Sequence, residues 1–516
     1  MLDDDDYLKE TGVIPIDGDS DQLFEAVCDG ILLCKLMNRA VPDTVDERTL
    51  NRPKKGKSLN PWEVLENINL AINSARSIGC HIVNIHANDL AKPKESHTEH
   101  LVLGLVWQVI QIQLLRSINL KEHPEIVALL QEGEEAKDLM NLPAHDLVLR
   151  WLNYHMAECG CDRRVTNFSS DLKDSVVYVH LLNRIAPSSM SLSVLDEKDP
   201  TARAAAVIDA AKAAGVPTFI QPGNIARGNR KLNLAFCAQV FNTIPGLSAG
   251  EDEMQAAMDA AGMMDEDTEG TREQQTYKLW MNSLGLENGE KFIHSFDESM
   301  SDGLTLLQVI EKVAPQALTP RRYTKSPEKL AKNPYKKIEN CNYIVEVCKA
   351  LGLKAEGIGG VDIANRNSKL IQGIVWQLMR MQVVNVLKEV GGGTAPKDGD
   401  IVRWANEKVA ASGKETRISS FRDRSISNSV FLLDLLKAIE PRAVNDELCT
   451  DGESEEDAKA NALYVLSVAR KLGCTVFLTW KDIVEVKSKM IMTLVASLMH
   501  LDRARGGSAA GAGGSA

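Results

Sequence analysis

DGILLCKLMN, at residues 29–38, is the first of four related phrases along this chain of 516 residues. Each later copy also begins with Asp or Asn and a small residue before an aliphatic run: DSVVYVHLLN at 174–183, DGLTLLQVIE at 302–311 and NSVFLLDLLK at 428–437. Successive copies lie about 125–145 residues apart, which is longer than a solenoid unit and matches a whole domain. The sequence therefore predicts four related domains in tandem.

Each repeat has the pattern of helices. The apolar residues of the first phrase recur at i, i+1, i+4 and i+5, as on one face of a helix. A second helix should start at Asn60-Pro61, because Pro suits the first turn of a helix, and Asn333-Pro334 repeats this start in the third copy. These patterns predict an all-α fold.

The repeats form two kinds. GLVWQ at 104–108 returns as GIVWQ at 373–377 in a last apolar helix, and we expect its tryptophans, Trp107 and Trp376, to be core residues. The even repeats have no tryptophan in that helix. The chain therefore reads as a duplicated two-domain module, with odd repeats related to odd and even to even.

An opening helix with a tryptophan is expected before each phrase. The Asp or Asn that starts each phrase is called the landmark residue, and the phrase the landmark phrase. Three tryptophans lie 23, 22 and 24 residues before the landmark residues of their repeats: Trp151, Trp280 and Trp404. The first repeat has only Tyr7 at that distance. We expect this repeat to lack its opening helix or to keep a remnant, as if the chain began inside a domain. The expected domains are residues 1–118, 142–247, 272–390 and 394–504, with an acidic linker at 248–271, a glycine hinge at 391–393 and a flexible Gly/Ser/Ala tail at 505–516.

The bulk composition excludes several classes of protein. The net charge of −12 argues against a dedicated nucleic-acid binder. The most apolar stretch, residues 101–115, is too short for a membrane span and carries three glutamines. The ten cysteines are scattered as reduced, buried residues usually are, and the acidic run at residues 3–6 is unlike a secretory signal. We expect a cytoplasmic protein that does not bind membranes.

These motifs resemble calponin-homology domains. The resemblance rests on the landmark phrases, the Asn-Pro helix starts, the Trp-Gln helices and the opening tryptophans, and it covers nearly the whole chain. Four such domains in two pairs resemble the fimbrin, or plastin, family, to which residues 41–48 and 84–90 are also similar. The resemblance implies that each pair binds an actin filament and that the whole chain bundles filaments, as a monomer on the actin cytoskeleton.

Two other functions stay open at this point. A scaffold or signalling adaptor could use calponin-homology domains without bundling actin, although four in paired order argue against it. A microtubule binder would use a lone domain and a coiled coil, and no sustained heptad run is present. The chain has no P-loop, no Gly-x-Ser-x-Gly and no His-Glu-x-x-His, so we expect no enzyme.

We expect no metal or cofactor. The resemblance implies EF-hands ahead of the first domain, and the chain has none. Residues 17–21 begin like a calcium loop, but Gln22 replaces the turn glycine and Cys28 stands where the bidentate glutamate belongs. His86, His97 and His100 lack the spacing of zinc ligands.

Basic charge separates the odd repeats from the even ones. The segment between the landmark phrase and the next long helix is called the interval. It is basic in the odd repeats and acidic in repeats two and four, around Asp196 and Asp446. Because complementary charge steers docking, we expect the odd repeats to face the acidic filament. The candidate contacts in these intervals are Arg52, Lys54, Lys55, Lys57, Arg321, Arg322, Lys325, Lys336 and Lys337.

The family resemblance adds a second group of candidate actin contacts. They lie before the Trp-Gln helices, on the exposed face of those helices and on the opening helix of an odd repeat. These residues are His86, Asn88, Lys92, Lys94, Gln108, Gln111, Gln274, Lys278, Asn365, Arg366, Lys369, Gln377 and Arg380.

Overall fold

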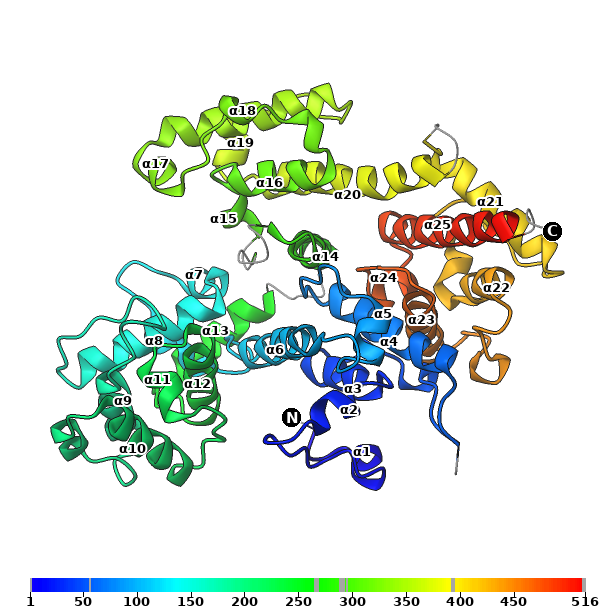
Figure 1. Cartoon of the computed structure of the whole chain (residues 1–516). Coiled ribbons are helices and arrows are strands. Elements are labelled where there is room, and N and C mark those ends of the chain that lie inside the picture. The colour runs from blue at the N-terminus through cyan, green and yellow to red at the C-terminus, as the bar shows by residue number, and fades with distance from the viewer. Residues whose placement is uncertain are drawn as a thin grey trace. The chain divides into compact units, whose positions relative to one another are not determined.

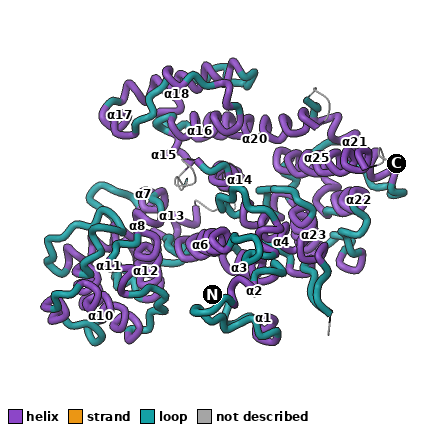
Figure 2. Tube along the Cα trace, viewed as in Figure 1, coloured by secondary structure: helices purple, strands orange, loops and turns teal. Residues whose placement is uncertain are grey.

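The computed structural model describes residues 2–54, 57–263, 269–286, 293, 296–390 and 395–512. Within these ranges the regular elements are helices and none is a strand (Figures 1 and 2). The predicted all-α fold is therefore confirmed for the described residues.

The chain divides into two compact units. One unit holds residues 1–109 and 273–516, and therefore repeats one, three and four. The other holds residues 110–272, and therefore repeat two.

Repeats one, three and four are built from helices in a similar order, named in Figure 1, although the number of short helices differs between them. Repeat one contains α1 (Asp6–Glu10), α2 (Gln22–Ala26), α3 (Ile31–Ala40), α4 (Pro61–Ser77), α5 (Ala87–Ala91) and α6 (Glu99–Arg116). Repeat three contains α14 (Glu269–Ser283), α15 (Phe296–Met300), α16 (Leu304–Val313), α17 (Pro327–Lys332), α18 (Pro334–Ala350), α19 (Gly360–Ala364) and α20 (Ser368–Val390). Repeat four contains α21 (Asp398–Ala411), α22 (Val430–Ile439), α23 (Glu455–Lys471), α24 (Trp480–Val484) and α25 (Ser488–Ala512).

The second unit is built around repeat two. Its helices are α7 (Ala136–Asn141), α8 (Ala144–Glu158), α9 (Val176–Ile185), α10 (Pro200–Ala213), α11 (Pro222–Ala226), α12 (Arg230–Thr243) and α13 (Glu251–Met263). Helix α13 lies in the expected acidic linker, so that segment is helical over half its length; its alanine, glutamate and methionine residues are good helix formers.

The opening of repeat one has a short helix, within the expected range of a remnant, whereas the end of repeat four differs from the expectation. Repeat one opens with α1, a helix of only 5 residues, where α8 and α14 have 15; Leu8 of α1 is nonetheless buried. Helix α25 continues to Ala512, so the structure is helical over most of the segment for which we predicted a flexible tail. A helix already nucleated by the packed residues before it can extend one residue at a time, and Ala509, Ala510 and Ala512 favour the helical state although the three glycines of this segment disfavour it.

Each landmark phrase starts its helix from a residue in the left-handed region. The φ angles are 76° at Gly30, 63° at Ser175, 74° at Gly303 and 65° at Ser429. A Cβ at Gly30 would lie 2.8 Å from the backbone carbon of Asn67, so the long helix α4 passes too close for a larger residue. The small residue of the phrase is therefore required by the packing of α4 against α3.

A buried side chain on the long helix holds this arrangement in repeat one. Asn67 Nδ2 donates to the carbonyl oxygens of Asp29 (3.0 Å) and Asn51 (2.9 Å), and its Oδ1 accepts from Asn51 N (2.9 Å). Asn67 is fully buried. One amide group thus ties the landmark residue and the end of the following interval to α4.

This hydrogen bond from the long helix to the landmark carbonyl oxygen is called the clamp, and it recurs in the other repeats. The landmark carbonyl oxygen accepts from Asn340 at 3.4 Å in repeat three and from Asn461 at 3.0 Å in repeat four. Repeat two uses Arg203, whose Nη1 lies 2.7 Å from the carbonyl oxygen of Asp174. The interaction is common to all four domains although the residue type is not.

Repeats three and four share one apolar core. A single cluster of buried residues runs from Tyr277 in α14 to Met499 in α25. Helices α20 and α25 contact each other, and Trp376 packs against this cluster from its edge. Trp107 and Trp376 are both half-buried, which corrects our expectation that they are core residues; Trp376 lies where Lys489 Nζ comes within 5.9 Å of its ring.

No helix of the described residues is both long and apolar enough to cross a membrane.

Replacement of Asn67 tests the clamp. We expect Asn67→Ala to destabilise repeat one by about 2–3 kcal/mol, because the Asn51 amide and the Asp29 carbonyl lose their buried partner. Hydrogen exchange read by mass spectrometry should show faster exchange in α3 and α4. Asn69→Ala on the same helix, at a half-buried position, is the control; equal exchange in both variants would contradict the role of the clamp.

A buried histidine makes repeat two sensitive to acid. His155 Nε2 lies 3.0 Å from the carbonyl oxygen of Pro245, and its Nδ1 accepts from Arg184 Nε at 3.2 Å. Burial lowers the pKa of His155 from 6.5 to about 4. A proton on Nδ1 would also place one donor against another, so the fold requires the neutral ring.

The stability of repeat two should therefore fall as the pH falls from 6.5 to about 4. In this window the unfolded chain binds a proton that the folded ring refuses, and the loss reaches roughly 3 kcal/mol. Hydrogen exchange of α8 and α12 across this range measures it. A His155→Gln variant should lose this part of the pH dependence; an unchanged pH profile in the variant would refute the assignment.

Candidate functional site

The basic interval of repeat one lies on the surface. Arg52, Lys54 and Lys57 are exposed, and Lys55 lies outside the described residues. The guanidinium of Arg52 lies 4.7 Å from the ring centroid of Tyr7, and its Nη2 is 3.1 Å from Glu47 Oε2. Arg52 thus braces the short helix α1, whereas Lys54 and Lys57 are exposed, and Lys57 N donates to Lys54 O at 2.8 Å.

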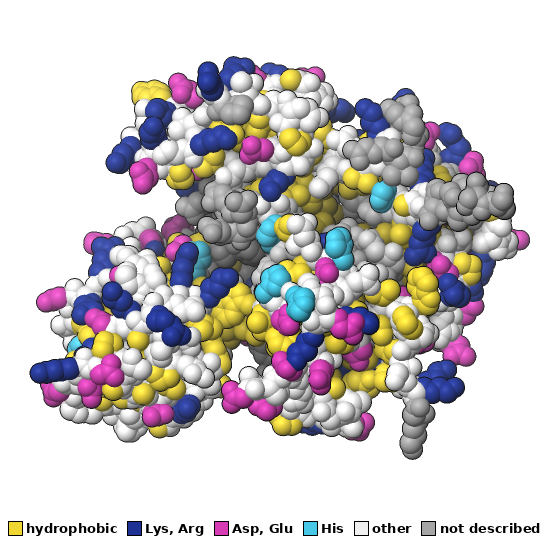
Figure 3. Space-filling model, in the orientation of Figure 1, with side chains coloured by type: hydrophobic (Ala, Val, Ile, Leu, Met, Phe, Trp, Pro, Cys, Tyr) yellow, Lys and Arg dark blue, Asp and Glu magenta, His cyan; other side chains and the backbone are white. Residues whose placement is uncertain are grey.

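The basic interval of repeat three is exposed in the same way. Arg321, Arg322 and Lys325 are exposed, and Lys336 and Lys337 are half-buried in the first turns of α18. In the space-filling view, Lys and Arg side chains gather over α17 and α18 (Figure 3).

Aromatic rings organise the cations of that interval. Arg322 pairs with Glu346 at 2.8 Å and stands 4.8 Å from the ring centroid of Tyr343. Lys325 Nζ lies 5.3 Å from the ring centroid of Tyr323. In each odd repeat, at least one Lys or Arg side chain of the interval therefore lies over an aromatic ring.

The segments before α6 and α20 are also exposed. His86, Asn88, Lys92 and Lys94 surround α5; Lys92 pairs with Glu95 at 2.7 Å, and Lys94 pairs with Asp21. Their counterparts are also exposed: Asn365 and Arg366 lie between α19 and α20, and Lys369 is the second residue of α20.

Two candidate glutamines have a structural partner. Gln108 Oε1 accepts from His81 N at 2.8 Å and its Nε2 donates to His81 O at 3.1 Å. Gln377 makes the same pair of bonds to the backbone of Lys354, at 2.6 and 3.1 Å. The glutamine of each Trp-Gln motif thus holds the loop that follows the long helix, which accounts for its presence without a partner protein.

The remaining candidates are partly engaged within the chain. Gln274 donates to Ser368 Oγ at 2.6 Å, and Arg380 pairs with Asp398 of repeat four at 2.6 Å. Gln111 and Lys278 are half-buried. The exposed lysines of the two intervals are therefore the candidates that the structure leaves most accessible.

The structure also reveals an interface between repeats one and four that the sequence did not predict. Helices α4 and α23 lie side by side (Figure 1). Arg470, only 4% exposed, donates from Nη1 to Thr44 O at 2.6 Å, and Ser467 Oγ accepts from Asp46 N at 2.8 Å. Lys471 Nζ donates to Thr49 O at 2.8 Å. Burial lowers the pKa of Arg470 to about 10, yet its backbone partners keep it hydrogen-bonded.

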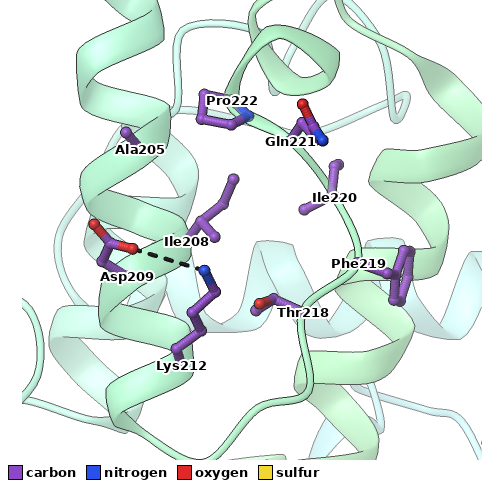
Figure 4. A pocket seen from close by; sticks show the side chains of 9 residues that line it. All are labelled: Ala205, Ile208, Asp209, Lys212, Thr218, Phe219, Ile220, Gln221 and Pro222. Carbon is purple, nitrogen blue, oxygen red and sulfur yellow. Dashed lines mark ion pairs between the residues drawn. The ribbon is translucent and has the colours of Figure 1, made fainter. Parts of the chain in front are cut away.

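The matching face of repeat two is open. A pocket of about 340 Å³ lies between α10 and the loop that leads to α11 (Figure 4). Counted from the glycine that ends each helix, Lys212 stands where repeat four has Arg470, and Phe219 where it has Phe477. Phe219 is 46% exposed and Phe477 only 8%. Repeats two and four therefore present the same face differently.

Among the described residues, no group of three or more His, Cys, Asp or Glu side chains is placed to hold a metal ion. The segment at residues 17–21 closes on itself, because Asp17 Oδ1 accepts from Asp19 N at 3.0 Å and Gln22 Oε1 accepts from Asp17 N at 2.8 Å.

Comparison with known proteins identifies the family. The calponin homology (CH) domain matches residues 7–114, 142–246, 271–383 and 395–504, which correspond to repeats one to four and are named CH1 to CH4. Over 501 residues the chain is 42% identical to Fimbrin-4 of Arabidopsis thaliana, covering 96% of this chain and 74% of that protein. The chain belongs to the fimbrin/plastin family.

Other family members agree. Fimbrin of Saccharomyces cerevisiae is 41% identical over 493 residues (95% of this chain, 75% of that protein), and human Plastin-3 is 41% identical over 505 residues (94% and 76%). The crystal structure of the actin-crosslinking core of Schizosaccharomyces pombe fimbrin superposes with a TM-score of 0.79 at 36% identity, covering 97% of this chain and 96% of that one. The predicted four CH domains and the family resemblance are confirmed.

Proposed function

We propose that this fimbrin-family chain binds actin filaments and crosslinks them into bundles. The observation that carries the proposal is the likeness to the actin-crosslinking core of Schizosaccharomyces pombe fimbrin, which extends over 97% of the chain. The likeness includes all four CH domains, so both pairs are present in one molecule. A molecule with two filament-binding modules can hold two filaments at once.

The odd CH domains are the proposed filament-facing parts. Their intervals carry exposed lysines and arginines, whereas the corresponding intervals of the even domains are acidic. On a chain with a net charge of −12, these local basic areas are where an acidic filament would be attracted rather than repelled. The even domains would then serve as supports, and CH4 already packs against CH1 through Arg470.

The proposed action is binding without catalysis, by a monomer on the actin cytoskeleton and without a bound cofactor. The alternative of a CH-domain adaptor that does not bundle actin is less well supported, because an adaptor has no need for both pairs of CH domains in the order of the crosslinking core.

Sedimentation with actin filaments tests this function. We expect the unmodified chain to pellet filaments at low speed, which requires bundling, and Lys54→Glu with Lys57→Glu to weaken binding several-fold at low ionic strength, where screening is small. Lys198→Glu, an exposed lysine in the corresponding interval of CH2, is the matched control.

High salt should reduce the difference between the variants, since exposed charges are screened beyond about 10 Å at 0.1 M. Binding that is unchanged by the CH1 reversals at low salt, or weakened equally by the Lys198 control, would contradict the filament-facing role of the odd domains.

A further inference from the structure

Two aromatic side chains project from equivalent places on the odd CH domains. Trp62 and Tyr335 are each 78% exposed, more than any other large hydrophobic side chain reported among the described residues. Each is the second residue of a 17-residue helix, α4 or α18. The even domains have Thr201 and Glu456 at this point, so the exposed ring is a property of the odd domains alone.

The backbone beneath both rings is held in place by the same motif. Asn60 Oδ1 accepts from Trp62 N at 2.9 Å, and Asn333 Oδ1 accepts from Tyr335 N at 3.0 Å. A proline at the first helical position fixes the intervening φ angle. The rings thus stand on preorganised helix starts, which lowers the entropy lost when they are covered by a partner.

The fold itself gains little from these rings. A side chain that keeps most of its surface in water contributes little burial energy, and tryptophan and tyrosine are enriched in the buried centres of protein interfaces. The rest of α4 is used elsewhere: its middle packs on α3, where Asn67 O accepts from Cys34 Sγ, and towards its far end Asn73 Nδ2 donates to Arg470 O of α23. The first turn with Trp62 points to solvent.

Exposed lysines precede both rings in the sequence. Exposed Lys54 and Lys57 precede Trp62, and exposed Lys332 precedes Tyr335. The nearest acidic groups on α4 are occupied, because Glu63 Oε2 accepts from Asn60 N at 2.8 Å and Glu66 pairs with Lys471 at 3.4 Å. An exposed aromatic ring that follows exposed lysines in the sequence fits a partner surface that is acidic around an apolar recess.

We infer that Trp62 and Tyr335 are the apolar anchors with which the two modules seat on the actin filament; this rests on the proposed function. Two modules that bind the same repeating partner need the same contact twice, and these rings repeat at one helix position in both odd domains. Interfaces concentrate their binding energy in a few Trp, Tyr and Arg residues surrounded by a polar rim. Here the interval lysines would form the rim, and the aromatic ring its centre.

Sedimentation of single and double variants tests the inference. We expect Trp62→Ala or Tyr335→Ala to abolish low-speed pelleting of filaments while high-speed binding through the other module persists. The double variant should bind filaments more weakly by tenfold or more, as expected for loss of central aromatic contacts. Trp62→Phe keeps an aromatic ring and should still bundle.

Salt dependence separates the anchors from the lysines. The loss of filament-binding affinity caused by Trp62→Ala should be the same at low and high salt, since apolar burial is not screened. The loss of affinity caused by Lys54→Glu should be smaller at high salt. Phe219→Ala, which removes a 46% exposed ring from CH2, is the matched control and should bundle normally. Thermal unfolding of each variant checks that the fold is retained.

The outcomes distinguish the inference from the function beneath it. If the unmodified chain fails to pellet with filaments, the proposed function is wrong and the inference falls with it. If the unmodified chain bundles and the Trp62→Ala and Tyr335→Ala variants bundle equally well, only the inference is overturned. The inference is also overturned if Trp62→Ala leaves bundling intact but abolishes binding to vesicles of anionic lipid.

Discussion

Each CH domain of this chain depends on one side chain that reaches from its long helix to the backbone carbonyl of the landmark residue. Asn67, Asn340 and Asn461 do this with an amide, and Arg203 does it with a guanidinium. In the three amide cases the same group also bonds the residue that ends the next interval. A buried amide with all its partners is stable, but a backbone group left without one is costly, so the landmark helix, the interval and the long helix are fixed together.

This clamp also determines where the variable parts of the domains stand. Asn67 holds Asn51, next to Arg52, and Asn340 holds Thr324, next to Lys325. The intervals can therefore be basic in the odd domains and acidic in the even domains, although each is held at the same point of the fold. The odd domains use that freedom for exposed lysines and an aromatic residue at the helix start. CH4 instead uses the side of its long helix, with Arg470 and Ser467, to pack against CH1.

The sequence predicted the frame well because its signals are local. The landmark phrases, the Asn-Pro starts and the small residue, Gly or Ser, before each landmark helix all act within a few residues. Contacts between residues far apart in the sequence could not be predicted from local patterns. We predicted Gln108 and Gln377 as surface contacts, but they form hydrogen bonds to loop backbones 27 and 23 residues away. Arg470 donates to Thr44, which is 426 residues away. The exposure of Trp62 has a local signal, since a residue just after an Asn-Pro cap lies in the first turn of a helix, which has no preceding turn to pack on.

Electron cryo-microscopy of actin filaments decorated with the chain tests the central claim most directly. The account predicts density in contact with the filament at the starts of α4 and α18 and at the basic intervals that precede them, with CH2 and CH4 held away from the filament surface. A complex in which the filament is contacted mainly by the even domains, or in which the α4 and α18 starts face solvent, would contradict it.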